Sequence, residues 1–336
     1  MSKLFLGLAL PLCILSLSAP ARAQEHPTYG LELEGFDYSH PVERYRFKSQ
    51  DSDVAMAFMD VKPQSPNGRT AVLLHGRNFC AATWEQTIAV LVKAGFRVIA
   101  PDQIGFCKSS KPQGYQFSIQ QLATNTNALL TSLGIPRATV IGHSLSGMTA
   151  IRYALMFPDA VEQMVLVNPI GLEDWQAKGV PFIDLDKGLE IEKATTFDRI
   201  KQYQQRFYYA GQWKPEYDRW VEMSAGMYRG PGAERVAQTQ ARIAEMAFIE
   251  PVVHEFERIR VPTLLMIGQL DRTALGVDRA PPELAKQLGN YPELGRAAAR
   301  RIPRVKLIEF PEAGDAPQIQ APDQFHAALL QGLGTQ

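Results

Sequence analysis

The order of hydrophobic and polar positions predicts strands that alternate with helices along most of the chain. Aliphatic runs such as TAVLLHG (70–76) are continuous, which is typical of parallel strands covered on both faces. The segments expected as strands are 42–48, 53–61, 70–76, 96–102, 138–144, 161–169, 261–268 and 305–311. The segments expected as helices between and after them are 84–93, 118–133, 145–157, 281–301 and a last helix from 322. This alternation predicts an α/β fold with a mostly parallel central sheet and helices on both faces.

The alternation is interrupted once, between the sixth and seventh expected strands. Residues 172–258 show little strand pattern and have helical periodicity near 186–208, 215–228 and 233–248. The segment is aromatic and contains Trp175, Trp213 and Trp220 together with several tyrosines. It is interpreted as a helical cap that closes an apolar ligand cavity, although the same aromatic side chains can simply pack the cap onto the main domain. The expected core therefore comprises 24–171 and 259–336, with the cap at 172–258.

The first residues have the pattern of a signal peptide. Lys3 precedes an apolar run over 4–17, and Ala21-Arg22-Ala23 provides a small-residue cleavage site. The run is shorter than the ~20 apolar residues that a membrane-spanning helix needs. We therefore expect residues 1–23 to be removed after Ala23, and the mature protein to be periplasmic or secreted without stable membrane insertion.

Charge and composition exclude several other kinds of partner. Lys+Arg and Asp+Glu are both 35, so no basic field is expected to attract nucleic acid. The chain has no HExxH pattern and no Cys/His spacing typical of a metal site, so no metal or cofactor is expected. The sequence leaves the oligomeric state open.

The strongest motif for chemistry surrounds Ser144. Gly142-His143-Ser144-Leu145-Ser146 follows the apolar strand ATVI and opens a helical segment. A sharp strand–turn–helix connection with small residues on both sides of a serine is typical of a nucleophile elbow. Ser146 stands where a glycine is usual. The helix N-terminus at this turn would help to stabilise developing negative charge.

With this motif the chain resembles the α/β-hydrolase family, over nearly all of the mature protein. The resemblance implies a serine hydrolase that acts on an apolar small-molecule ester, lactone or related acyl compound. It also implies an oxyanion loop after the third strand, beginning with His75. The residues assigned by the resemblance to the oxyanion hole are Gly76, Arg77, Asn78 and Leu145.

The resemblance places the acid and the base of a catalytic triad in the C-terminal part. Asp271 follows the strand after the cap, where the family has its acid. The family's histidine is expected in the loop after the last strand, but the chain reads Gly314-Asp315-Ala316-Pro317 there. An ordinary aspartate has a pKa near 3.9 and is a poor acceptor for a serine proton. If Asp271 and Asp315 lie close together, repulsion between their charges raises the pKa of one of them.

None of the six histidines is expected to replace the missing base. His143 adjoins Ser144, but the alternation of side chains along a strand points it away. His75 belongs to the oxyanion loop, and His326 lies in the final helix, where it is the nearest in sequence to Asp315. The others are His26, His40 and His254.

Two cysteines remain after removal of the signal peptide. In this fold the loops that carry Cys80 and Cys107 follow neighbouring strands, so a disulfide between them is one hypothesis, and export permits it. Two free, buried thiols are the alternative.

Two functions remain open from the sequence. Ser144, the oxyanion loop and Asp271 favour a serine hydrolase, impaired because Asp315 replaces the base. Asp315 by itself favours a catalytically inactive protein that binds an apolar small molecule in the capped pocket.

Overall fold

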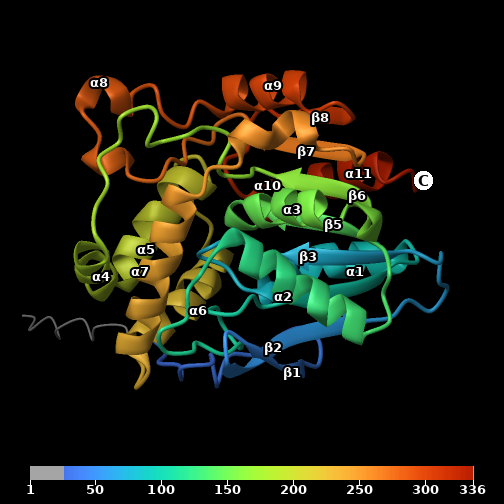
Figure 1. Cartoon of the computed structure of the whole chain (residues 1–336), viewed down its shortest axis with the longest axis horizontal. Helices are drawn as coiled ribbons and strands as arrows, with labels where there is room; N and C mark the ends of the chain where they lie inside the picture. Colours follow the sequence, from blue (N-terminus) through green and yellow to red (C-terminus); the bar gives the residue numbers. More distant parts are fainter. Residues whose placement is uncertain (1–25, 336) are drawn as a thin grey trace, which may run out of the picture.

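The computed structural model describes residues 26–335, so the predicted signal peptide at 1–23 lies outside the described residues. Eight strands form one sheet in the order β1-β2-β4-β3-β5-β6-β7-β8 (Figure 1). Their bounds are β1 Glu43–Ser49, β2 Ser52–Val61, β3 Thr70–Leu74, β4 Arg97–Pro101, β5 Ala138–His143, β6 Val161–Val167, β7 Thr263–Gly268 and β8 Val305–Phe310. The pairs β1–β2 and β2–β4 are antiparallel, and every pair from β4–β3 to β7–β8 is parallel. The mostly parallel sheet expected from the sequence is confirmed.

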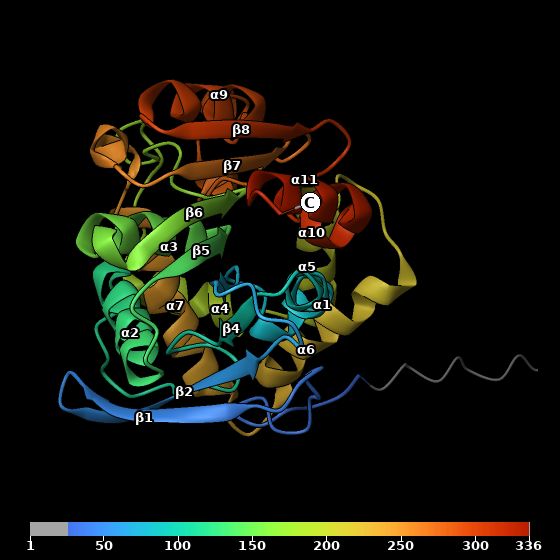
Figure 2. The same cartoon turned by 90° about the vertical axis from the view of Figure 1, so that its right-hand side faces the viewer.

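Helices cover both faces of this sheet (Figure 2). One face is covered by α1 (Glu85–Lys93) and α11 (Pro322–Gly332), and the other by α2 (Ile119–Ser132), α3 (Leu145–Met156) and α9 (Tyr291–Arg301). The alternation of side chains along a strand divides the buried apolar residues between the two faces. In β3, Ala71 and Leu73 join the core under α1 and α11, whereas Val72 and Leu74 join the core under α2 and α3. A strand that supplies both cores must be apolar throughout, which explains its continuous hydrophobic run.

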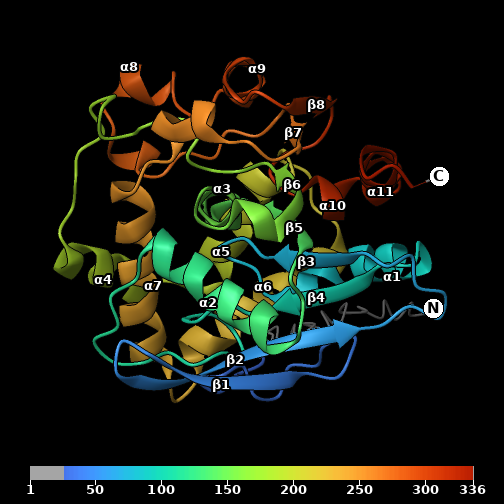
Figure 3. The ribbon, with the colours of Figure 1, turned by 45° about the vertical axis from the view of Figure 1, so that its right-hand side comes forward.

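A helical insertion, defined here as residues 168–262, connects β6 to β7 at one end of the sheet (Figure 3). Its α-helices are α4 (Leu185–Lys193), α5 (Phe197–Tyr203), α6 (Asp218–Arg229) and α7 (Ala233–Ile249), and a π-helical turn spans Gln204–Tyr208. The single helical pattern at 186–208 is divided because Thr196 begins a new helix by accepting a hydrogen bond from the Arg199 N–H at 3.2 Å. None of the helices within residues 26–335 is both long and apolar enough to cross a membrane.

The helical pattern expected over 281–301 is also divided in the structure. It forms the short α8 (Pro282–Ala285) and the longer α9, with Gly289 between them at a φ of +65°. A Cβ at Gly289 would lie 2.6 Å from the main-chain oxygen of Arg272, so only glycine fits there. The remaining short α-helix is α10 (Pro317–Gln320), and 3-10 turns span Ala81–Trp84, Pro158–Ala160, Pro215–Tyr217, Val253–Arg258 and Val277–Arg279.

A disulfide joins the loops after β3 and β4. Cys80 and Cys107 are bonded, with their Cα atoms 5.9 Å apart, and both residues are buried. The disulfide hypothesis is therefore confirmed, and the alternative of two free thiols is wrong. The bond lies beside the loop that begins with Gly76, and Cys107 lines the cavity described below.

Candidate active site

Ser144 occupies a sharp turn between β5 and α3. Its φ of 51° and ψ of −116° lie in a backbone region that residues other than glycine rarely adopt. Holding a residue in such a conformation typically costs about 1–3 kcal/mol. The turn is tight, because a Cβ at Gly142 would lie 2.2 Å from the main-chain oxygen of Ser146. The Ser146 hydroxyl, which stands where a glycine is usual, donates a hydrogen bond to the main-chain oxygen of His75 at 2.5 Å. The departure from the usual motif therefore ties the turn to the end of β3.

The loop after β3 passes directly beside Ser144. A Cβ at Gly76 would lie 3.2 Å from the Ser144 Cβ and 2.7 Å from His143 Nδ1, so the close approach requires glycine here. Arg77 and Asn78 line the same cavity as Ser144. Leu145 is the first residue of α3, so its N–H has no acceptor within the helix. The structure thus brings together the four residues that the sequence suggested for an oxyanion hole.

Asp271 is fully buried beyond the end of β7. Its Oδ2 accepts a hydrogen bond from Asn168 Nδ2 at 3.0 Å, and its Oδ1 accepts one from the Thr273 N–H at 2.7 Å. Burial, and then the negative charge of Asp315, raise the pKa of Asp271 well above its usual value. The two carboxyl groups are therefore close enough to interact, as acid and base positions of a triad should be.

Asp315 is fully buried in the loop after β8. Its N–H donates to the main-chain oxygen of Phe207 at 3.1 Å, which attaches the loop to the π-helical turn of the insertion. Its Oδ2 lies 3.0 Å from His143 Nε2. That nitrogen makes its hydrogen bond with the main-chain oxygen of Asp315 at 2.8 Å, and within residues 26–335 neither carboxylate oxygen accepts a well-directed hydrogen bond.

The contact between His143 and Asp315 was not predicted from the sequence. As strand alternation predicts, no hydrogen bond joins His143 to Ser144 in the described residues. Its ring instead stacks on Phe79, with centroids 5.7 Å apart, and reaches Asp315. These two residues are 172 positions apart in the chain, so only the register of the assembled sheet could have revealed their contact.

Three of the other histidines are engaged elsewhere. His75 Nε2 accepts from the Gln103 N–H at 3.1 Å, and burial lowers the pKa of His75. His326 contacts Thr87 through Nε2 at 2.9 Å, and burial lowers its pKa to about 4. His254 pairs with Asp174 on the exposed surface. None of these contacts involves Ser144, in agreement with the expectation that they do not replace the base.

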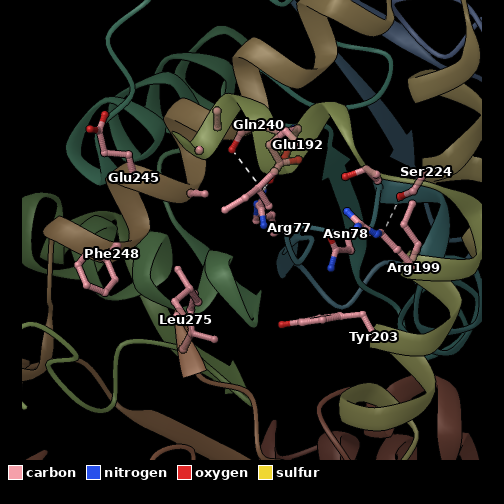
Figure 4. A pocket seen from close by; sticks show the side chains of 18 of the residues that line it. Arg77, Asn78, Glu192, Arg199, Tyr203, Ser224, Gln240, Glu245, Phe248 and Leu275 are labelled. Atoms are coloured by element: carbon pink, nitrogen blue, oxygen red, sulfur yellow. Dashed lines mark hydrogen bonds and ion pairs between the residues drawn. The ribbon is translucent and has the colours of Figure 1, made fainter. Parts of the chain in front are cut away.

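Ser144 lies on the wall of a cavity of about 530 Å³ between the core and the helical insertion. Figure 4 shows its two sides, with Phe248 and Leu275 on one and Asn78, Arg199 and Tyr203 on the other. The cavity is thus partly apolar and partly polar. The three tryptophans of the insertion do not line it, whereas the tyrosines Tyr203, Tyr208 and Tyr228 do. For the tryptophans, packing is the correct interpretation.

The paired carboxyl groups should make stability depend on pH. Because the folded-state pKa of Asp271 is raised, the folded protein binds more protons than the unfolded chain above about pH 4, and the free energy of unfolding falls as pH rises toward the folded pKa. Asp315→Asn removes the neighbouring charge, so it should lessen this loss, by about 1.4 kcal/mol for each pKa unit removed. Urea unfolding of both proteins between about pH 4 and about pH 7 measures the difference. Parallel stability profiles would contradict the proposed interaction.

Comparisons with known proteins agree with this fold. The sequence model of the α/β-hydrolase fold family matches residues 71–322. A crystal structure described as that of a probable hydrolytic enzyme from Pseudomonas aeruginosa PAO1 is 59% identical, with a TM-score of 0.91, and the match covers 92% of this chain and 99% of that chain. The AB hydrolase superfamily protein YisY from Bacillus subtilis is 26% identical over 278 residues, which cover 79% of this chain and 91% of YisY.

The esterase EaEST from Exiguobacterium antarcticum shares the fold, with a TM-score of 0.66 and 21% identity over 85% of this chain and 97% of the esterase. Its likeness concerns the fold alone. The family match spans most of the chain and includes Ser144, Asp271 and the strands that precede them. The chain belongs to the α/β-hydrolase fold family.

Proposed function

We propose that this protein is a serine hydrolase that acts on an ester, lactone or related acyl compound, with Ser144 as its nucleophile. The observation that carries the proposal is the backbone of Ser144, held at positive φ between β5 and α3 and facing the cavity. A strained conformation at the N-terminus of a helix is explained if it exposes the serine hydroxyl to a substrate.

In this mechanism the Ser144 Oγ attacks the carbonyl carbon, and the carbonyl oxygen becomes negatively charged. The N–H groups of Leu145 and of Arg77 or Asn78 would stabilise that charge. Each such donor is typically worth about 10²–10³ in rate. The apolar side of the cavity, with Phe248 and Leu275, would hold the hydrophobic part of the substrate.

The site lacks an evident acceptor for the proton of the Ser144 hydroxyl. Asp315 occupies the expected position of the base, and a carboxylate is a weak acceptor for a serine proton at neutral pH. We therefore propose that the chain is impaired in both acylation and deacylation. Loss of one triad member can still leave a rate about 10³–10⁴-fold above that in water.

The test uses an activated ester, because its good leaving group should keep acylation faster than deacylation and so let an acyl-enzyme accumulate. Incubated with p-nitrophenyl acetate, the protein should accumulate one acetyl group on the peptide that contains Ser144, and mass spectrometry after proteolysis should detect it. Ser144→Ala should remain unmodified at that peptide. Acetylation only at surface lysines, equal in both proteins, would refute Ser144 as the nucleophile.

An inactive binding protein is the second candidate, favoured by the replacement of the base with Asp315. In that case the cavity would bind an apolar small molecule without turnover. Absence of an acyl adduct, combined with reversible binding of intact esters, would favour this function over hydrolysis.

We also propose that the protein is exported to the periplasm or beyond. The pattern of residues 1–23 and the Cys80–Cys107 disulfide both support this, because disulfides persist in oxidising compartments. The mature chain should then begin at Gln24, and an intact mass that retains residues 1–23 would contradict export.

A further inference from the structure

The side chains of the oxyanion loop are attached to the helical insertion. The Arg77 guanidinium forms an ion pair with Glu192 of α4 and donates to the main-chain oxygen of Gln240 in α7 at 3.3 Å. Figure 4 shows Arg77 next to these two residues at the cavity wall. The position of this loop residue therefore depends on two helices of the insertion.

Glu192 is held on both of its carboxylate oxygens. One pairs with Arg77, and the other accepts a hydrogen bond from the Tyr228 hydroxyl of α6 at 2.6 Å. Burial opposes the charged form of Arg77, but the charge of Glu192, its hydrogen bond to Arg77 and the nearby Tyr228 together outweigh burial, so the pKa of Arg77 is raised. Burial and the charge of Glu192 also raise the pKa of Tyr228 well above its usual value. Glu192 thus joins the oxyanion loop to α6 as a charged hydrogen-bond acceptor.

Asn78 is attached to the insertion independently. Its Nδ2 donates to the Tyr208 hydroxyl at 3.0 Å, and its main-chain oxygen accepts from the Ser224 hydroxyl at 3.1 Å. Arg77 and Asn78 together therefore contact α4, the π-helical turn, α6 and α7. The end of β3 alone does not determine where their N–H groups point.

We propose that Glu192 is a positioning residue, which orients Arg77 so that the oxyanion hole is complete only while the insertion is seated on the core. This inference rests on the proposed function of Ser144. A donor must lie about 2.7–3.1 Å from the oxyanion to stabilise it. Errors of about 1 Å can cost as much as 10²-fold in rate. A carboxylate that fixes the loop would then affect the charged transition state more than the neutral substrate.

The test compares two ligands that share one ring. Phenylboronic acid accepts the Ser144 oxygen on its trigonal boron, the serine proton passes to the buffer, and the tetrahedral boronate carries the negative charge of an oxyanion. Benzamide keeps the ring but forms no adduct. In Glu192→Gln, phenylboronic acid should bind about tenfold more weakly, less than the effect of losing a donor outright, while benzamide binding stays within about twofold. Titration calorimetry gives both affinities.

Glu234→Gln is the matched control, since Glu234 of α7 also pairs with a residue of α4, Lys193 at 2.9 Å, but lies outside the cavity lining. It should leave both affinities unchanged. Tyr228→Phe removes only the hydroxyl that donates to Glu192, and it should weaken phenylboronic acid binding by a smaller factor. If Glu192→Gln does not fold, Tyr228→Phe alone tests whether Glu192 positions Arg77.

The outcomes separate this inference from the proposed function. If Glu192→Gln weakens the binding of both ligands equally, then Glu192 only shapes the cavity. If it leaves phenylboronic acid binding unchanged, then Glu192 does not act on the oxyanion hole. Either result overturns the inference. If Ser144→Ala binds phenylboronic acid as well as the parent does, then Ser144 is not the nucleophile, and the proposed function falls together with the inference.

Discussion

Asp315→His is expected to raise kcat/KM on short p-nitrophenyl esters by at least about 10²-fold, which is what a positioned general base contributes. The substitution would return an imidazole to the loop after β8. The loop itself is already fixed, because the Gly314 N–H donates to Gln320 Oε1 at 2.8 Å and the Asp315 N–H donates to Phe207. The new side chain would therefore start from a defined backbone position.

The partner for that imidazole is in place. Asp271 is buried and is held by Asn168 and Thr273, so its carboxylate can orient a neighbouring ring and stabilise the cation that forms on it. The substitution also removes the like charge that raises the pKa of Asp271. Burial, the larger cause of the raised pKa, remains, but a cationic imidazole beside Asp271 would favour the ionised form of its carboxyl group.

Two variants make this result interpretable. Asp315→Asn changes the charge without supplying a base, so it should not gain activity. Ser144→Ala combined with Asp315→His should lose the gained activity. A parent protein that already hydrolyses these esters as fast as Asp315→His would show that another base serves Ser144 and that Asp315 does not limit the rate.

Much of the fold could be predicted because its signals are local. Each strand that supplies both cores must be apolar throughout, so TAVLLHG (70–76) predicts a central strand from its own composition. The turn at Ser144 could be predicted in the same way, since a strand, small residues and a helix follow one another within a few positions. Helix breaks were harder to predict. Gly289 divides the helical pattern at 281–301 because of a close approach to Arg272, which is a tertiary contact.

The environment of the candidate base could not be predicted in the same way. The contact between His143 and Asp315 joins the ends of two strands that are not neighbours in the sheet. The attachment of Arg77 to Glu192 joins a core loop to α4, 115 positions away. The first contact depends on where the loop after β8 lies, and the second depends on where α4 of the helical insertion lies. No local pattern in the sequence encodes either position.

Reduction of the Cys80–Cys107 disulfide is expected to lower the free energy of unfolding by about 3–4 kcal/mol. The two cysteines are 27 positions apart, and a cross-link over a loop of this length removes about that much conformational entropy from the unfolded chain. Urea unfolding with and without a phosphine reductant measures the change. Because the bond is buried, the reductant is best added to unfolded protein before refolding.

The Cys80→Ala/Cys107→Ala double variant is the control. It should be less stable than the oxidised parent by a similar amount and should not respond to the reductant. Reduction should also weaken ligand binding in the cavity, since Cys80 ends the loop that carries Arg77 and Asn78 and Cys107 lines the cavity itself. If the reductant shifts the double variant as much as the parent, or shifts neither, then the cross-link does not supply the stability assigned to it.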